Sequence, residues 1–291
     1  MKKKTLYLIS LLILLFILSA CSIEENNKIS KVVVSTSIIA NVAEQVNGEI
    51  LEITVLLPAG VDPHSYQPTP QDIAAIADAD LLLINGYGLE EYLNSIIDEN
   101  DLNEKLHVVS EGIEIEDGDP HVWLDTVNVI TWVGNITEAF VDLQPENEAE
   151  FRENAKDYIR QLNELDNWIY EAVGQLPDEK RILVSDHLSL GYFAQRYGFE
   201  MGGTITQSSS SLVEPSAQDL AELIDMIVEQ GLQAVFIGHE ANPQLAESLT
   251  DDLDIMLVEL FIGSLSNQDG PAGSYIELMR FNVDAIVTAL K

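Results

Sequence analysis

The sequence is poor in cysteine and in positive charge. Its 291 residues include one cysteine, Cys21, so neither an intramolecular disulfide nor a thiolate metal cluster can form. Only 14 residues are lysine or arginine, against 49 aspartates and glutamates, which gives a formal net charge of −35. A chain this acidic repels phosphate backbones, which argues against a nucleic-acid partner, and it attracts cations. Hydrophobic residues, at 46%, suffice for a sizeable core, which excludes wholesale disorder.

The N-terminal segment is typical of a secretion signal. Three lysines precede an apolar run over residues 6–18, and small residues then lead to Cys21. The run is shorter than the roughly 20 residues of a membrane span, so we expect residues 1–20 to be removed rather than kept as a transmembrane anchor. Residues 18–21 (LSAC) resemble a bacterial lipobox, which makes Cys21 the lipidated first residue of the mature chain. Residues 21–31 then form a lipid anchor and flexible tether, and the protein is extracytoplasmic.

Strands alternate with helices in two separate stretches. Over residues 32–143, short hydrophobic runs alternate with segments whose apolar residues have helical spacing. The same alternation restarts over residues 177–291. This order predicts the α/β class, with a mainly parallel sheet flanked by helices in each stretch. Between them, residues 144–176 place apolar side chains at steps of three and four. A helix of about 30 residues spans about 45 Å, so we interpret it as a rigid helix that joins two lobes. An ordinary surface helix of a single domain is the alternative.

Three of the five histidines follow predicted strands. They are His64, His121 and His187, and an aspartate precedes each of them by one or two residues. In open α/β sheets, ligands gather at the carboxyl ends of strands. A metal-bound imidazole usually donates its second N–H to a carboxylate or carbonyl group. The pattern therefore favours a metal site, with a surface or capping role for each histidine as the alternative.

The other histidines give weaker signals. His107 lies at the start of an apolar strand, and we interpret it as structural. His239 and Glu240 follow a predicted strand over residues 234–237, so they point toward the same rim, and their role stays open. No local pair of histidines has the spacing of HExxH or of a zinc finger. The metal hypothesis therefore depends on loops that are far apart in the sequence.

Five segments resemble the zinc and manganese solute-binding lipoproteins of ABC transporters, the ZnuA/TroA-like periplasmic metal-binding proteins. The similarity runs from about Val32 to the C-terminus, and the motifs are specific when taken together. The segments are residues 60–70 (GVDPHSYQPTP), 119–125 (DPHVWLD), 186–198 (DHLSLGYFAQRYG), 214–220 (EPSAQDL) and 273–282 (GSYIELMRFN).

The resemblance implies two α/β lobes joined by one long helix, with a divalent metal in the cleft between them. It implies His64 and His121 as ligands from the N-terminal lobe and His187 from the C-terminal lobe. The metal-loaded protein would dock on the membrane permease of an ABC transporter. We expect a monomer that binds and delivers its metal without catalysing a reaction.

Two departures from the family pattern matter. The family often has an aspartate in the loop after the last strand, where this chain has Gly263. The usual fourth ligand is therefore missing, and water, Glu240 or His239 are the candidates to replace it. Residues 111–119 are short, acidic and free of histidine. The metal-collecting loop of many zinc-type relatives is therefore absent or reduced.

The donor set indicates which metal is bound. Three imidazoles suit zinc, whereas manganese prefers more oxygen donors. Manganese members of the family tend to resemble a set of two histidines and two carboxylates, so His187 together with Gly263 favours zinc. Manganese and iron are the alternatives. Two other functions stay open: a surface adhesin, which could coexist with transport, and, less favoured, a zinc hydrolase with Glu240 as its base.

Overall fold

The computed structural model describes residues 29–93, 96–97, 102–115 and 118–291. The predicted signal peptide, Cys21 and most of the predicted tether lie outside these residues. Within the described part of the chain, no helix is both long enough and apolar enough to cross a membrane.

The N-terminal lobe is built on a parallel sheet with the strand order β2-β1-β3-β4. Its central strands are short runs of valine or leucine (KVVV and LLLI), because helices cover both faces of the sheet. Val32 and Val34 face one core with helix α2, whereas Val33 faces another with Ile76 of helix α3. The elements are β1 (Lys31–Val34), α2 (Ser37–Asn47), β2 (Glu52–Val55), α3 (Pro70–Asp78), β3 (Leu81–Ile84), β4 (Leu106–Val108) and α5 (Thr126–Leu143).

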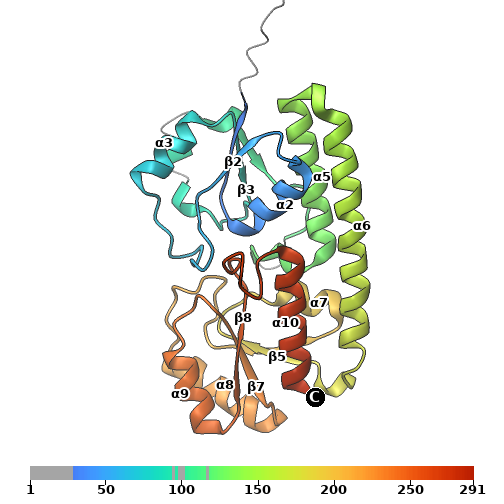
Figure 1. Cartoon of the computed structure of the whole chain (residues 1–291). Coiled ribbons are helices and arrows are strands. Elements are labelled where there is room, and N and C mark those ends of the chain that lie inside the picture. The colour runs from blue at the N-terminus through green and yellow to red at the C-terminus, as the bar shows by residue number, and fades with distance from the viewer. Residues whose placement is uncertain (1–28, 94–95, 98–101, 116–117) are drawn as a thin grey trace, which may run out of the picture.

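The C-terminal lobe repeats this arrangement with the order β6-β5-β7-β8, again parallel (Figure 1). The prediction of two parallel, helix-flanked sheets is confirmed. The elements are β5 (Ile182–Ser185), α7 (Gly191–Tyr197), β6 (Glu200–Thr204), α8 (Ala217–Gln230), β7 (Ala234–Gly238), α9 (Gln244–Leu253), β8 (Met256–Leu260) and α10 (Tyr275–Leu290).

Strand β6 has no counterpart among the predicted strands. Its sequence, EMGGT, contains two adjacent glycines and only one β-branched residue. A Cβ atom on Gly202 would lie 2.7 Å from Cγ2 of Ile182 in β5. Glycine at position 202 therefore permits the close approach of β5, a tertiary requirement that local pattern does not reveal.

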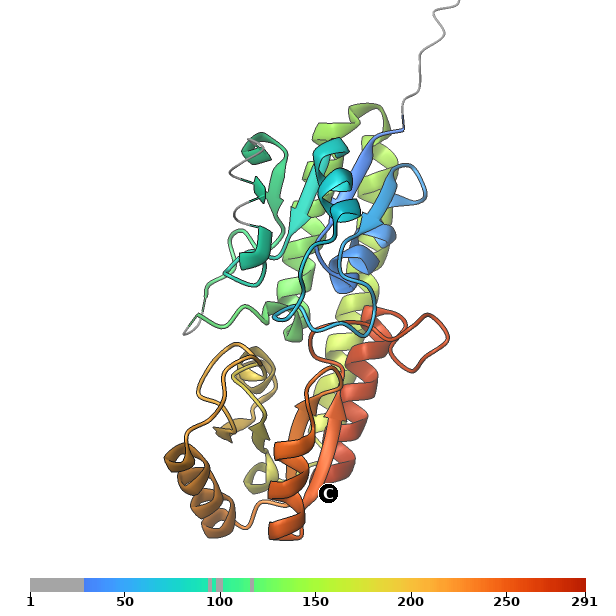
Figure 2. The same cartoon turned by 90° about the vertical axis from the view of Figure 1, so that its left-hand side faces the viewer.

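The long helix α6 (Glu148–Val173) runs beside both lobes (Figures 1 and 2). It packs against α2 and α5 of the N-terminal lobe and against α10 of the C-terminal lobe. A 3₁₀ turn, η4 (Pro145–Asn147), precedes it, so the helix is slightly shorter than the predicted stretch. Its 26 residues correspond to about 39 Å, which is long enough to brace both sheets.

One continuous hydrophobic core joins the lobes. It includes Val32 of β1, Leu162 of α6 and Phe236 of β7, all 0% exposed. Packed interiors are about as dense as organic crystals, so two sheets that share a core cannot rotate freely about each other. The loops at the carboxyl ends of the two sheets therefore face each other at a defined separation.

Leu162→Ala is expected to lower the free energy of unfolding by about 2–5 kcal/mol, because it leaves a cavity in the shared core. The control is Glu164→Ala on the same helix. Its exposed side chain pairs with Arg160 at 2.8 Å, and loss of such a pair changes stability by about 0.5 kcal/mol or less. Urea denaturation of both variants measures the difference, and equal effects would contradict a core shared through α6.

Candidate metal centre

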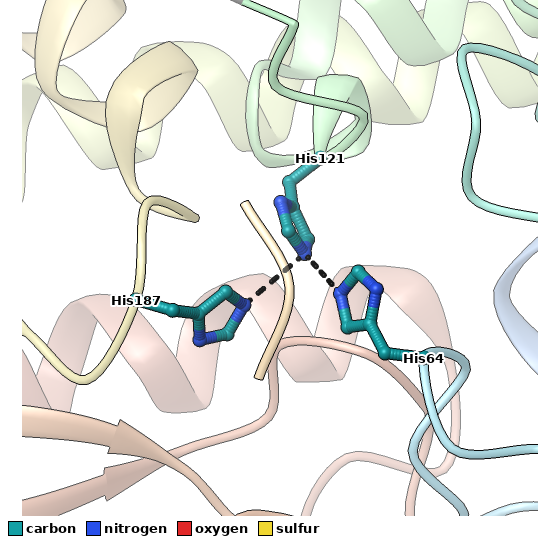
Figure 3. A group of neighbouring side chains, drawn as sticks. All are labelled: His64, His121 and His187. Atoms are coloured by element: carbon teal, nitrogen blue, oxygen red, sulfur yellow. Dashed lines mark hydrogen bonds between the residues drawn. The ribbon is translucent and has the colours of Figure 1, made fainter. Parts of the chain in front are cut away.

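Three histidine side chains from distant parts of the sequence point at one another (Figure 3). His64 lies in the loop after β2, and His187 is the second residue after β5. His121 directly precedes the 3₁₀ turn η3 (Val122–Leu124). Nε2 of His121 lies 3.2 Å from Nε2 of His64 and 3.4 Å from Nε2 of His187. The candidate ligand atoms of all three lie within 4.8 Å of one another.

Two of the rings are oriented by neighbouring carboxylates. Nδ1 of His121 lies 2.7 Å from Oδ1 of Asp119, and Nδ1 of His187 lies 2.9 Å from Oδ1 of Asp186. A carboxylate accepts hydrogen bonds, so in the neutral rings the proton is on Nδ1 and the lone pair is on Nε2. Two Nε2 acceptors thus face each other, an arrangement that a cation between them would stabilise.

His64 departs from the predicted pairing of aspartate and imidazole. Oδ1 of Asp62 accepts a hydrogen bond from the backbone N–H of His64 rather than from its ring. The other oxygen, Oδ2, accepts a hydrogen bond of 2.6 Å from the hydroxyl of Ser211 in the opposite lobe. Asp62 therefore fixes the loop that carries His64 and ties it to the C-terminal lobe.

The protonation of the rings follows from their surroundings. Burial, together with the other two rings, lowers the pKa of His64 to about 3. Burial also lowers the pKa of His121, and Asp119 offsets this only in part. Burial acts in the same direction on His187, but the hydrogen bond and charge of Asp186, with Asp62 and Asp119, raise its pKa above 6.5. Two rings are thus neutral near pH 7, and His187 is the first to accept a proton.

The rings line a small cavity between the lobes. Its volume is about 20 Å³, which is room for about one water-sized particle. Carboxylates of Asp62, Asp186 and Glu240 line it together with the histidines. His121 is 1% exposed and His187 is 4% exposed, whereas His64 is only partly buried, so the cavity is closed on the side of the first two rings and more open on the side of His64.

The two candidates for a fourth ligand are placed differently. Oε1 of Glu240 accepts hydrogen bonds from the backbone N–H and the hydroxyl of Ser264, at 3.0 and 2.8 Å. Glu240 lines the cavity of the three histidines, although it does not join the group of converging ligand atoms among the described residues. His239 pairs with Glu259 at 2.9 Å and lines a separate cavity of about 380 Å³. The structure therefore does not bring His239 to the site.

Sequence reasoning missed two residues that hold the site together. Ser211 belongs to the polar run TQSSSS (residues 206–211), whose composition indicates only a loop. Trp123 lies within one of the motifs, but only its contacts reveal its role. Its indole N–H donates to the carbonyl of Ile262 in the other lobe at 2.9 Å, and its own carbonyl accepts from the hydroxyl of Tyr275 at 2.7 Å.

Solved and curated proteins share this architecture. The periplasmic zinc-binding protein TroA of Treponema pallidum superposes with a TM-score of 0.84 at 30% identity, covering 90% of this chain and 99% of that one. The manganese-binding lipoprotein MntA of Halalkalibacterium halodurans is 31% identical over 300 residues, 99% of each chain. The metal ABC transporter substrate-binding lipoprotein SsaB of Streptococcus sanguinis is 26% identical over 308 residues, also 99% of each chain.

The fold and these similarities together identify the chain as an extracytoplasmic metal-binding component of an ABC transporter. More particularly, the chain belongs to the family described as zinc-uptake complex component A, periplasmic (ZnuA), whose sequence profile matches residues 32–289. Members of this family bind and hand over a substrate, so the protein is a binding protein and not an enzyme.

Asp119→Ala is expected to weaken divalent metal binding by about 10–100-fold, because His121 loses the acceptor that fixes its tautomer and ring orientation. The matched control is Asp142→Ala, which removes an exposed carboxylate near the end of α5. Isothermal titration calorimetry on metal-stripped protein measures both variants. Equal affinities in the two variants would show that Asp119 does not support the site.

Proposed function

We propose that this protein captures zinc between its lobes, with His64, His121 and His187 as ligands, and delivers it to an ABC permease. The observation that carries the proposal is the convergence of three Nε2 atoms, two of them spaced 3.2 and 3.4 Å from the third. Two nitrogens that each lie about 2.05 Å from a tetrahedral zinc ion are about 3.3 Å apart. The two spacings to His121 therefore suit a tetrahedral zinc ion.

Manganese is the second candidate, and iron is a further alternative. Manganese prefers oxygen donors, and the carboxylates of Asp62, Asp186 and Glu240 line the same cavity. The relative MntA is named as manganese-binding and the relative TroA as zinc-binding, so both metals have a precedent at similar identity. We favour zinc because the three converging donors are all nitrogens.

The fourth position is filled by water or by Glu240. Glu240 uses Oε1 to bind Ser264 and lines the cavity, so Oε2 would be the oxygen that it offers to a cation there. Burial raises the pKa of Glu240, and a bound cation would favour its ionised form. His239 takes no part, since it faces another cavity.

The N-terminal segment indicates where in the cell the protein acts. Lipidation at Cys21 would keep the protein at the outer face of the cell membrane, attached by the tether that begins there. The bound metal bridges both lobes, because His187 comes from one and His64 and His121 from the other. A monomer in this bridged form is the species that the permease would recognise. Several relatives are named as substrate-binding lipoproteins of metal ABC transporters, which supports this scheme.

His187→Ala is expected to lower zinc affinity by more than about 100-fold, a larger loss than that of a residue that only orients a ligand. His239→Ala is the matched control, because it removes a half-exposed histidine from the neighbouring cavity. Metal analysis and calorimetry should give one zinc per chain for the wild type and the control. Equal loss in the two variants would argue against the three-histidine site.

The choice between metals is tested by competition. We expect zinc to bind at least about tenfold more tightly than manganese, as the order of affinities for nitrogen sites predicts. Glu240→Gln keeps the shape of the side chain and removes its charge. It should weaken manganese more than zinc if Glu240 supplies the fourth donor, and it should change neither if water does. Tighter binding of manganese than of zinc by the wild type would reverse our assignment.

Metal affinity should fall as the pH falls. A metal binds the unprotonated imidazole, so protons compete with it. His187, whose pKa is raised above 6.5, accepts the first proton, so the loss should begin near neutral pH and continue as the pH decreases. Zinc titrations between about pH 8 and pH 5 measure this. A constant affinity over that range is incompatible with histidine ligands.

A further inference from the structure

His121 is the central member of the histidine cluster. Its Nε2 atom lies close to Nε2 of both other rings, and dashed lines join it to each of them in Figure 3. His64 and His187 come from different lobes, so a displacement of His121 would change both spacings at once. The convergence of the three nitrogens therefore depends on the contacts that hold the peptide of His121 in place.

Asn85 binds the peptide that leads into His121. Its Nδ2 group donates one hydrogen bond of 3.0 Å to the carbonyl of Pro120 and another of 3.0 Å to the carbonyl of Gly86. Asn85 is 0% exposed, so bulk water does not compete for these bonds. Proline has no N–H, so the carbonyl is the backbone group through which a hydrogen bond can hold residue 120.

A buried hydroxyl group fixes the direction in which the amide of Asn85 points. Oγ of Ser110 donates to Oδ1 of Asn85 at 2.9 Å and accepts from the indole N–H of Trp132 at 2.9 Å. An indole N–H can only donate, so the hydroxyl proton of Ser110 goes to Asn85. Ser110 and Trp132 are also 0% exposed. A flipped amide would turn its oxygen toward two carbonyl oxygens, so this chain of hydrogen bonds has one direction.

The backbone of Asn85 is fixed independently of its side chain. The carboxyl oxygens of the buried Glu90 accept from the backbone N–H groups of Asn85 and Gly86, at 2.8 and 2.9 Å. The hydroxyl of Ser35, which follows β1, donates to the same carboxyl group at 2.7 Å. Strand β3 ends one residue before Asn85. Asn85 is therefore anchored to the edge of the sheet, from which its side chain reaches the loop of His121.

His121 is thus held at two separate points. Asp119 accepts hydrogen bonds from its ring Nδ1 and from its backbone N–H, at 2.7 and 2.9 Å. These contacts orient the ring, but Asp119 belongs to the same loop and moves with it. Asn85 belongs to the end of a buried strand and acts one residue before His121. It is therefore the contact that fixes the position of the loop relative to the sheet.

We propose that Asn85 is a positioning residue for the metal site, which holds the peptide before His121 so that its ring reaches the other two histidines. The hydrogen bonds from Trp132 through Ser110 keep the amide in the orientation that this requires. Asn85 acts on the backbone beside a ligand and not on the metal itself. This inference rests on the proposed function, because metal binding is its readout.

Asn85→Ala is expected to lower zinc affinity by about 10–100-fold, as loss of a group that supports a ligand does. Competition against a chromophoric chelator measures the affinity. The matched control is Thr137→Ala, which removes another buried hydrogen bond of the N-terminal lobe, the one of 2.6 Å from Thr137 to the carbonyl of Val133 in α5. The control should lower the melting temperature of the metal-free protein and leave zinc affinity unchanged.

The role of the hydroxyl is tested with Ser110→Ala. This change removes the donor to Oδ1, so the amide of Asn85 can turn away from Pro120, and we expect a loss of zinc affinity smaller than that of N85A. The double variant N85A/S110A should bind zinc as N85A does, because the hydroxyl acts through the amide. Additive losses would overturn the role assigned to the hydrogen-bond chain.

Cobalt(II) in place of zinc separates a positioning role from a purely structural one. Its visible absorption depends on the arrangement of the donor atoms, so the spectrum should change in N85A and match the wild type in T137A. If N85A lowers the melting temperature but keeps the wild-type zinc affinity and cobalt spectrum, Asn85 is only structural and the proposal is wrong.

Two further outcomes are distinguishable. Wild-type protein that binds neither zinc nor cobalt would overturn the proposed function and this inference with it, whereas a wild type that binds both, with N85A unchanged, would overturn this inference alone. If N85A does not fold, S110A carries the test. The proposal then requires weaker zinc binding and an altered cobalt spectrum in S110A, and wild-type values for both would contradict it.

Discussion

Three imidazole rings from opposite lobes converge within a few ångströms, and the contacts between the lobes hold them there. Asp119 and Asp186 hold the ring protons of His121 and His187 on Nδ1, so the Nε2 lone pairs of these two rings face each other when both are neutral. Free loops would separate such rings. Here the shared core, helix α6 and the hydrogen bonds of Trp123 keep them together. The scaffold thus prepares in advance the geometry of the proposed metal site.

This constraint also explains why the lobes are joined so firmly. A site built from opposite lobes requires a constant distance between the two sheets. A helix that packs against both lobes maintains this distance better than flexible connecting segments would. The freedom that remains belongs to the loops, above all the one that carries His64. That loop meets the opposite lobe through Gly60, Asp62 and Pro63, and these contacts link metal capture to contact between the lobes.

The sequence predicts the local parts of this arrangement well. Runs of valine and leucine identified both sheets, and helical periodicity identified α6. An aspartate near each histidine predicted the ring contacts of two of them. The rest depends on groups that meet only in the folded chain. No periodic or local pattern predicts these contacts. They are the hydrogen bond between Ser211 and Asp62, the hydrogen bond from the backbone N–H of His64 to Asp62, the separate position of His239 and the closeness of Gly263 to Pro63. Strand β6 was not predicted for the same reason.

The small size of the interlobe cavity has a consequence for the ions that the protein rejects. Cations in water carry several tightly held waters, and a space of about 20 Å³ admits about one particle of that size. A cation that occupies this space would therefore have lost most of its hydration shell. Magnesium dehydrates reluctantly, and calcium requires six to eight oxygens, which three imidazoles cannot replace. With the three histidines as the proposed ligands, the cost of dehydration would disfavour these abundant cations, although the strongly acidic chain attracts them.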